Sequence, residues 1–84
     1  MIYRVTLPIP VVKELDRLPI TMQVRIEKEI KNLEQHPRPP GCLKLTGRNA
    51  WRIKVGDYRV LYEIDDDNLI IIIVRVRHRK DSYR

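Results

Sequence analysis

Residues 51–64, WRIKVGDYRVLYEI, form the stretch from which the fold can be worked out. Apolar and polar side chains alternate on both sides of Gly56-Asp57, and this period of two is typical of strands with one buried face. A glycine at the first position of a two-residue link between such strands favours a tight hairpin turn. We therefore expect an antiparallel hairpin in which Lys54 lies directly opposite Arg59.

The charged face of this hairpin carries Arg52, Lys54 and Arg59, because side chains alternate strictly along paired strands. Two like charges directly opposite one another destabilise a strand pair. The arrangement is explained if an anion normally lies between them, and it is also explained by a solvated face that only maintains solubility. The other face must pack on helices, and it carries Trp51, Ile53, Val55, Tyr58, Val60 and Tyr62.

Upstream of the hairpin, the sequence predicts one strand and a pair of helices. Residues 2–7 are rich in β-branched and aromatic residues, as strands are. Helical periodicity runs through residues 11–18 and 20–35, and Pro19 separates the two stretches. A break this short implies an antiparallel helical hairpin. The apolar stripe consists of Val11, Val12, Leu15, Leu18, Met22, Ile26, Ile30 and Leu33.

The remaining segments complete a sheet. Residues 36–41, HPRPPG, form a loop, and residues 42–47 form a short strand or an extended entry to the hairpin. DDDN at 65–68 turns the chain into LIIIIVRVR at 69–77, which begins apolar on both faces and so favours a strand covered on both sides. The prediction is an α+β fold with an N-terminal strand, an antiparallel helical hairpin, and then an antiparallel sheet of three to four strands.

The last strand runs into a cluster of positive charge that repels itself. A meander returns this strand beside residues 58–64, so the cluster ends near the Gly56 turn and Arg59. The register through residues 65–68 is not fixed, so the arginine that joins the Lys54 face is left open. Arginine binds phosphate through paired hydrogen bonds and tyrosine stacks on bases, so this surface suits RNA. The cluster consists of Arg75, Arg77, His78, Arg79 and Lys80, followed by Tyr83.

Composition indicates the class of partner. The 84 residues suffice for one domain, 1–84, and their formal charge of +6 favours a polyanion such as nucleic acid. The single cysteine, Cys42, forms no internal disulfide and fits a reducing compartment. No secretory signal peptide is recognisable and no apolar run is long enough to span a bilayer, so we expect a cytoplasmic protein without a membrane partner.

Common catalytic and metal-binding motifs are missing. The chain has no convincing Ser/His/Asp set, no glycine-rich phosphate loop and no HExxH motif. The acids at 65–67 are better explained as turn formers than as metal ligands, so we expect no metal and no cofactor. His78 is either a base or hydrogen-bond donor acting on phosphate, or an exposed spacer.

Two long motifs resemble a known family. LKLTGRNAWRIKVGDYRVLYEI at 43–64, followed by an aliphatic strand and VRVRHRKDSYR at 74–84, is similar to the RelE/ParE toxin superfamily. Within it, the chain resembles the RelE-type branch of ribosome-dependent mRNA endonucleases. The likeness covers nearly the whole chain and implies the small RelE-like fold. Its most specific parts are Leu45–Gly47, WRIKVGDYRVLY at 51–62 and V-x-H-R at 76–79.

The resemblance implies a set of site residues. Its catalytic positions fall on Lys54, Arg59, Arg79 and Tyr83. The basic residues around them are candidate RNA contacts: Arg52, Lys44, Arg75, Arg77, His78 and Lys80. The family usually has glycine where this chain has Arg77. A large charged side chain there would narrow the site or change the bend that aims Arg79.

The mechanism that the resemblance implies needs no metal. The RNA 2′-OH attacks the adjacent phosphorus, leaving a 2′,3′-cyclic phosphate and a 5′-OH. Arg59 and Arg79 would stabilise the developing charge, Lys54 is a candidate base, and Tyr83 would orient the 2′-OH or stack on a base. The implied partners are the ribosome with its mRNA, and a cognate antitoxin with an acidic or amphipathic segment.

Two alternatives come from other functional classes. A ParE-like toxin would have the same fold, bind DNA gyrase and cleave nothing. A degenerate toxin would only bind its antitoxin, and Arg77 in place of glycine gives this alternative some support.

Overall fold

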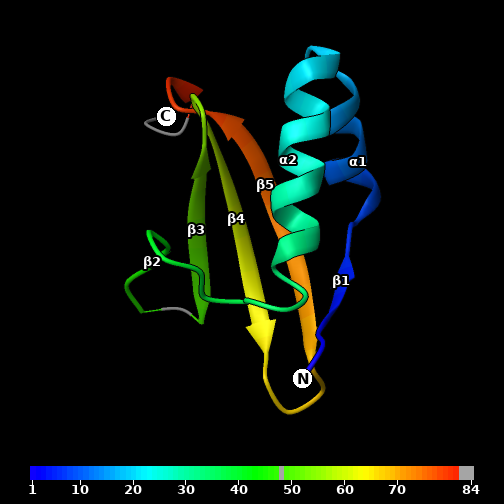
Figure 1. Cartoon of the computed structure of the whole chain (residues 1–84). Coiled ribbons are helices and arrows are strands. Elements are labelled where there is room, and N and C mark those ends of the chain that lie inside the picture. The colour runs from blue at the N-terminus through cyan, green and yellow to red at the C-terminus, as the bar shows by residue number, and fades with distance from the viewer. Residues whose placement is uncertain (48, 82–84) are drawn as a thin grey trace.

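The computed structural model describes residues 1–47 and 49–81. In these residues the chain forms a five-stranded sheet and two helices (Figure 1). The elements are β1 (Arg4–Thr6), α1 (Ile9–Asp16), α2 (Ile20–Asn32), β2 (Leu43–Lys44), β3 (Ala50–Val55), β4 (Tyr58–Asp65) and β5 (Ile70–His78). The strand order is β1-β5-β4-β3-β2, with β1 parallel to β5 and the other pairs antiparallel. This arrangement confirms the predicted α+β fold.

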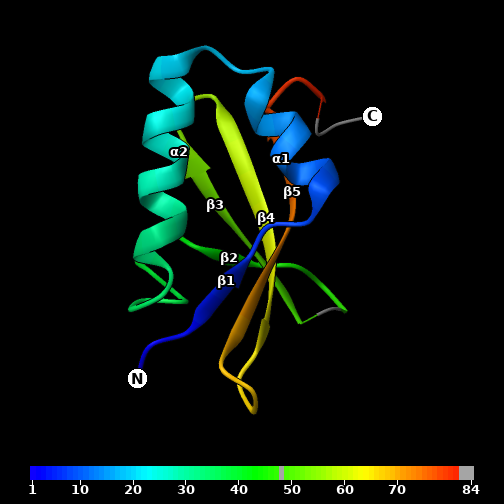
Figure 2. The same cartoon turned by 90° about the vertical axis from the view of Figure 1, so that its right-hand side faces the viewer.

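Both helices cover the same face of the sheet, and they lie in front of it in Figure 2. Pro10 sits in the first turn of α1, where its missing N–H costs no hydrogen bond. α2 follows Pro19 and ends at Asn32, three residues before the predicted end. Residues 33–35 form a turn instead. His36 precedes Pro37, and because the residue before a proline avoids the helical conformation, the helix must end before it. Neither helix of the described chain is long and apolar enough to cross a membrane.

The core lies between the helices and the face of the sheet that they cover, which we call the inner face. Its largest fully buried side chains are Tyr62, Ile26, Leu33, Ile71, Ile73, Val11 and Val60. The apolar face of the predicted hairpin is buried as expected, except that Trp51 and Tyr58 are half-buried. In the described part of the chain no charged side chain is fully buried. Any site built from charged residues therefore lies at the surface.

The β3–β4 hairpin has the predicted register, with Lys54 paired to Arg59. Gly56 has φ of 60°, the left-handed conformation that the tight turn requires and that glycine adopts without strain. A Cβ atom there would lie 3.3 Å from Nη1 of Arg25 and 3.4 Å from Cε of Met22, both on α2. α2 thus packs against the turn and supports the end of the hairpin at which the basic side chains gather.

β5 lies inside the sheet, between β1 and β4, but other described segments cover only one of its faces. Ile71 and Ile73 are fully buried, whereas Ile72 between them is 37% exposed. The prediction that this strand is covered on both sides is therefore wrong, because the two helices form one layer on one face. A register shift at Leu61/Tyr62 then sets the alignment of the rest of β5 against β4.

Candidate active site

Three basic residues lie side by side across the outer face of the sheet, which is the face away from the helices. Lys54 on β3 pairs with Arg59 on β4, and Arg59 pairs in turn with Arg77 on β5. Directly paired residues point to the same face, so the register left open by the sequence places Arg77 here. We call Lys54, Arg59 and Arg77 the basic row. The next row contains Arg52, Leu61 and Arg75.

An open hollow of ≈ 500 Å³ lies between the basic row and the β3–β4 turn. It is lined by Lys54, Gly56, Asp57, Tyr58, Arg59, Arg79 and Lys80. Three of the catalytic candidates implied by the family resemblance therefore surround one space: Lys54, Arg59 and Arg79. We call it the basic hollow. Positive charges converging on one hollow favour an anion such as a phosphate group.

The backbone of Arg79 is tied to the hairpin turn. Its N–H donates to the carbonyl oxygen of Asp57 at 2.8 Å. Its Nε also lies 3.8 Å from Oδ1 of Asp57, but both side chains are mostly exposed and such pairs contribute little to stability. The backbone bond thus ties residue 79 to the turn beside the hollow. Sequence reasoning assigned Asp57 only to the turn, although an acid beside so many basic residues is a signal for such a pairing.

The side chain of Arg77 turns away from the basic hollow. Its Nε lies 3.5 Å from Oε2 of Glu14 on α1, and Oε1 of the same carboxylate accepts the N–H of Val76 at 3.3 Å. Arg77 lines a separate hollow with Glu14 and His78. Sequence reasoning missed Glu14, because 62 residues separate it from Val76 and no local pattern connects them.

Two other predicted RNA contacts do not join the basic row. Lys44 pairs with Trp51, and its Nζ lies 5.9 Å from the centre of the Trp51 ring, so Lys44 belongs to the inner face. His78 pairs with Tyr58 and meets its ring edge-on, with the ring centres 5.2 Å apart. Nδ1 of His78 accepts the N–H of Lys80 at 3.2 Å. In the structure His78 therefore packs against Tyr58, and Lys44 lies away from the hollow.

The set of predicted site residues is completed by Arg52, Arg75, Lys80 and Tyr83. Arg52 and Arg75 lie on the outer face, in the row next to the basic row. Lys80 lines the basic hollow. Tyr83 lies outside the described residues.

Similarity to known proteins identifies the family. A family model described as ParE toxin of type II toxin-antitoxin system, parDE, matches residues 10–83. The chain belongs to the RelE/ParE superfamily of type II toxins. A putative RelE-like toxin protein of Escherichia coli is 32% identical to this RelE/ParE toxin over 88 residues, which cover 99% of this chain and 92% of that protein.

Two further relatives differ in how much of the RelE/ParE toxin they match. Toxin RelG of Mycobacterium tuberculosis is 55% identical over 29 residues, which are 34% of this chain and 33% of that protein. The crystal structure of the archaeal RelE-RelB complex from Pyrococcus horikoshii OT3 matches with a TM-score of 0.84 at 34% identity, covering 94% of this chain and 97% of that chain. The superfamily resemblance and the RelE-like fold are therefore confirmed.

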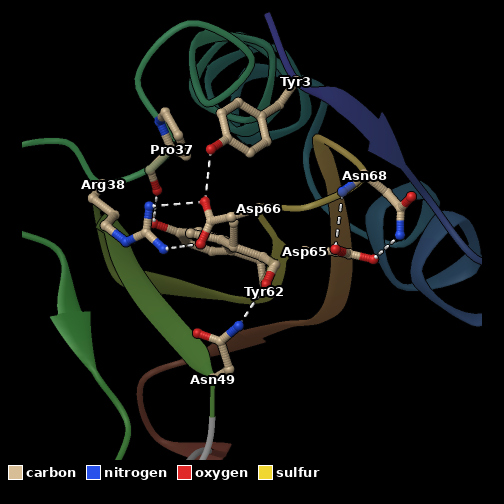
Figure 3. A network of polar contacts seen from close by, with 9 residues as sticks. Tyr3, Pro37, Arg38, Asn49, Tyr62, Asp65, Asp66 and Asn68 are labelled. Atoms are coloured by element: carbon tan, nitrogen blue, oxygen red, sulfur yellow. Dashed lines mark hydrogen bonds and ion pairs between the residues drawn. The ribbon is translucent and has the colours of Figure 1, made fainter. Parts of the chain in front are cut away.

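A second polar cluster lies at the opposite end of the sheet of this RelE/ParE toxin (Figure 3). The hydroxyl of Tyr3 donates to Oδ1 of Asp66 at 2.6 Å, and Arg38 donates to both oxygens of the same carboxylate, at 2.8 and 3.3 Å. The bonds from Arg38, and then that from Tyr3, hold the pKa of Asp66 below its ordinary value. Arg38 also lies 5.0 Å from the centre of the Trp51 ring. We call Tyr3, Arg38 and Asp66 the clamp.

The acidic segment at 65–68 spans the last residue of β4 and the turn that follows it, and several of its hydrogen bonds are drawn in Figure 3. Asp65 accepts the backbone N–H and the side-chain amide of Asn68 at 3.1 and 2.8 Å, and these bonds lower the pKa of Asp65. Nearby, the buried Tyr62 donates to the carbonyl oxygen of Pro37 at 2.7 Å, and burial raises its pKa. Among residues 1–47 and 49–81, no cluster of His, Cys, Asp and Glu has the size needed to hold a metal ion.

Proposed function

We propose that this toxin is a ribosome-dependent endoribonuclease, which cuts mRNA in the cytoplasm and so stops translation. The observation that supports this proposal is the convergence of Lys54, Arg59 and Arg79 on the basic hollow. The three side chains come from β3, from β4 and from the residue that follows β5. Their common target is best explained by a phosphate group that gains negative charge during a reaction.

The proposed reaction is an internal transfer on RNA. The 2′ oxygen bonds to the adjacent phosphorus while the bond from phosphorus to the 5′ oxygen of the next nucleotide breaks. The 2′ proton passes to a base, for which Lys54 is the candidate, and the leaving 5′ oxygen takes up a proton. Arg59 and Arg79 stabilise the charged oxygens on phosphorus, and one such preorganised donor is worth about 3–4 kcal/mol. Tyr83 keeps its predicted role of orienting the 2′-OH or stacking on a base.

The ribosome supplies what the open hollow lacks. A shallow surface site holds a flexible RNA strand loosely, so the reacting atoms are seldom aligned. mRNA held in the decoding site is already positioned, and positioning is one of the largest contributions to catalysis. Arg52, Arg75 and Lys80 flank the hollow on the outer face or at its edge, where they would contact the neighbouring phosphates.

The partner in the resting cell is proposed to be a protein antitoxin. The archaeal relative was crystallised as a RelE-RelB complex. The formal charge of +6 favours a partner segment that is acidic or amphipathic and covers the basic face.

The site is tested by removing its arginines singly. We expect Arg59→Ala and Arg79→Ala each to reduce cleavage of mRNA on programmed ribosomes by at least about 100-fold, because each removes a donor to the transition state. Primer extension locates the cuts, and the downstream fragments should carry a 5′-OH. Arg4→Ala removes the same charge from β1 and serves as the control. Undiminished cleavage by both folded variants would overturn the assignment.

Inhibition of DNA gyrase is the second candidate, and the description of the matching family model as a ParE toxin favours it. Induction of the toxin in cells separates the two. The endoribonuclease stops translation first and leaves DNA supercoiling unchanged. Loss of supercoiling with intact mRNA would instead support gyrase as the target.

A further inference from the structure

The basic row places positive side chains directly opposite one another in two neighbouring strand pairs. Arg59 is paired with Lys54 on one side and with Arg77 on the other. Like charges directly opposite one another in a sheet repel and destabilise the pairing. With three cations in a line, a phosphate also has two competing positions: between Arg59 and Lys54, or between Arg59 and Arg77.

Glu14 on α1 meets the last member of this row. Its Oε2 lies 3.5 Å from Nε of Arg77, and the two side chains are 25% and 39% exposed. α1 packs against β5, as Figure 2 shows. The ion pair draws Arg77 around the edge of β5, into the hollow that it shares with Glu14 and His78. The basic hollow is lined by Lys54, Arg59 and Arg79 without Arg77.

The same carboxylate also holds the backbone of β5. Along β5, β1 pairs with Ile70, Ile71 and Ile72, so it does not reach the C-terminal half of this strand. The N–H of Val76 lies on this stretch and donates to Oε1 of Glu14 at 3.3 Å. Arg79 follows three residues later, and its own N–H is bound to Asp57. Glu14 and Asp57 therefore fix the two ends of the short segment that delivers Arg79.

We propose that Glu14 is a positioning residue for the RNA site, which keeps Arg77 out of the basic hollow and holds the end of β5 that carries Arg79. This inference rests on the proposed function. It explains how the chain accommodates Arg77 beside Arg59, which already faces Lys54. A released Arg77 would lie next to Arg59 and bind the same phosphate. Such binding strengthens the ground-state complex without aiding the transition state, so the RNA binds more tightly while the chemical step slows.

The first test is Glu14→Gln, which keeps an oxygen for the N–H of Val76 but removes the charge that holds Arg77. On programmed ribosomes we expect kcat to fall about 10- to 100-fold, as misplacement of a reacting group does, while KM does not rise. A general loss of stability would instead lower the amount of active protein and the unfolding midpoint. Glu29→Gln makes the same change at an exposed site on α2 and is the control. An unchanged kcat for Glu14→Gln would overturn the proposal.

The second test asks whether Glu14 acts through Arg77. In an Arg77→Gly background, Glu14→Gln should change kcat by less than about twofold. The charge of Glu14 acts through Arg77, so its removal has little effect on kcat once the Arg77 side chain is absent. A loss of equal size in both backgrounds would overturn this part of the proposal, since Glu14 would then act by another route.

The third test does not depend on cleavage. Toxin is titrated with a short RNA whose 2′-OH at the scissile position is replaced by hydrogen, so that no cleavage occurs. Glu14→Gln should bind this RNA more tightly than the original chain, and Glu14→Gln with Arg77→Gly should not. If the original chain fails to cut mRNA on ribosomes, the proposed function falls, but this comparison still decides the inference. Equal affinity of Glu14→Gln and the original chain would overturn it.

Discussion

Lys44 and Lys54 are both exposed lysines on neighbouring strands, yet they lie on opposite faces of the sheet. Lys44 pairs with Trp51, whereas Lys54 lies three residues further along the same partner strand. Successive side chains of a strand point to alternate faces, so two positions an odd number of residues apart lie on opposite faces. At the scale of the residue, position on the strand therefore decides which lysine reaches the basic hollow.

This difference between the lysines can be measured directly. We expect Lys54→Ala to reduce ribosome-dependent cleavage by about 100-fold or more, as loss of a proton-transfer group does. Lys44→Ala should change cleavage by less than about threefold, as is usual for a surface substitution away from a site. Both variants lose one positive charge, so each controls for the effect of net charge on the other. Equal losses would show that the hollow does not define the site.

At the scale of the element, the β3–β4 turn connects stability with the position of a catalytic arginine. Gly56 adopts φ of 60°, and the neighbouring Asp57 accepts the N–H of Arg79 at 2.8 Å. A distorted turn therefore moves the acceptor on which Arg79 depends. Gly47 also has a positive φ, of 73°, but among the described residues not adjacent to it in the chain, a Cβ atom there would have no neighbour within 4 Å.

These two glycines make a matched pair for substitution. Gly56→Ala and Gly47→Ala should each destabilise the fold by about 1–2 kcal/mol, the cost of a side chain in the left-handed region. Only Gly56→Ala should also lower kcat, by about tenfold, because it displaces the acceptor of Arg79. Urea unfolding gives the first quantity and single-turnover cleavage on ribosomes gives the second. A similar loss of kcat in both variants would argue against a positioning role of the turn.

At the scale of the whole molecule, the two ends of the sheet have different tasks. The end near Gly56 gathers cations that repel one another, which is unfavourable for folding and suited to an anionic ligand. The opposite end carries the clamp, in which Arg38 and Asp66 neutralise each other and Tyr3 completes the hydrogen bonding. The clamp joins the start of the chain, the proline loop and the β4–β5 turn, which lie far apart in the sequence.

The clamp predicts how stability changes in acid. The pKa of folded Asp66 is lowered by the bonds from Arg38 and Tyr3, so its contribution is fully present above the ordinary carboxyl pKa and is lost as the pH falls through the lowered value. The unfolding midpoint should therefore drop between about pH 5 and pH 2, and Asp66→Asn should make that drop shallower. It should not abolish it, because the pKa of Asp65 is lowered as well.

Chemical denaturation at a series of pH values measures this dependence. Asp67→Asn removes the same charge from the same turn and serves as the control, because Asp67 is exposed and the Tyr3 and Arg38 bonds end on Asp66. If Asp66→Asn and Asp67→Asn show the same pH profile, the clamp contributes nothing specific to stability.

The sequence alone determined the features that depend on neighbours along the chain. Helical periodicity and the break at Pro19 predicted the helical pair, and alternation about Gly56-Asp57 predicted the pairing of Lys54 with Arg59. A two-residue turn fixes the register of its strands, so this part of the candidate site was also predictable.

The tertiary structure decided the features that depend on distant packing. The longer turn between β4 and β5 and the register shift at Leu61/Tyr62 leave the alignment of β5 to the contacts of the folded sheet. These contacts place Arg77 opposite Arg59. Only folding brings α1 to β5, so that Glu14 meets Arg77. Such contacts join segments more than sixty residues apart. Their physical basis is close packing and charge pairing in space, which no local periodicity records.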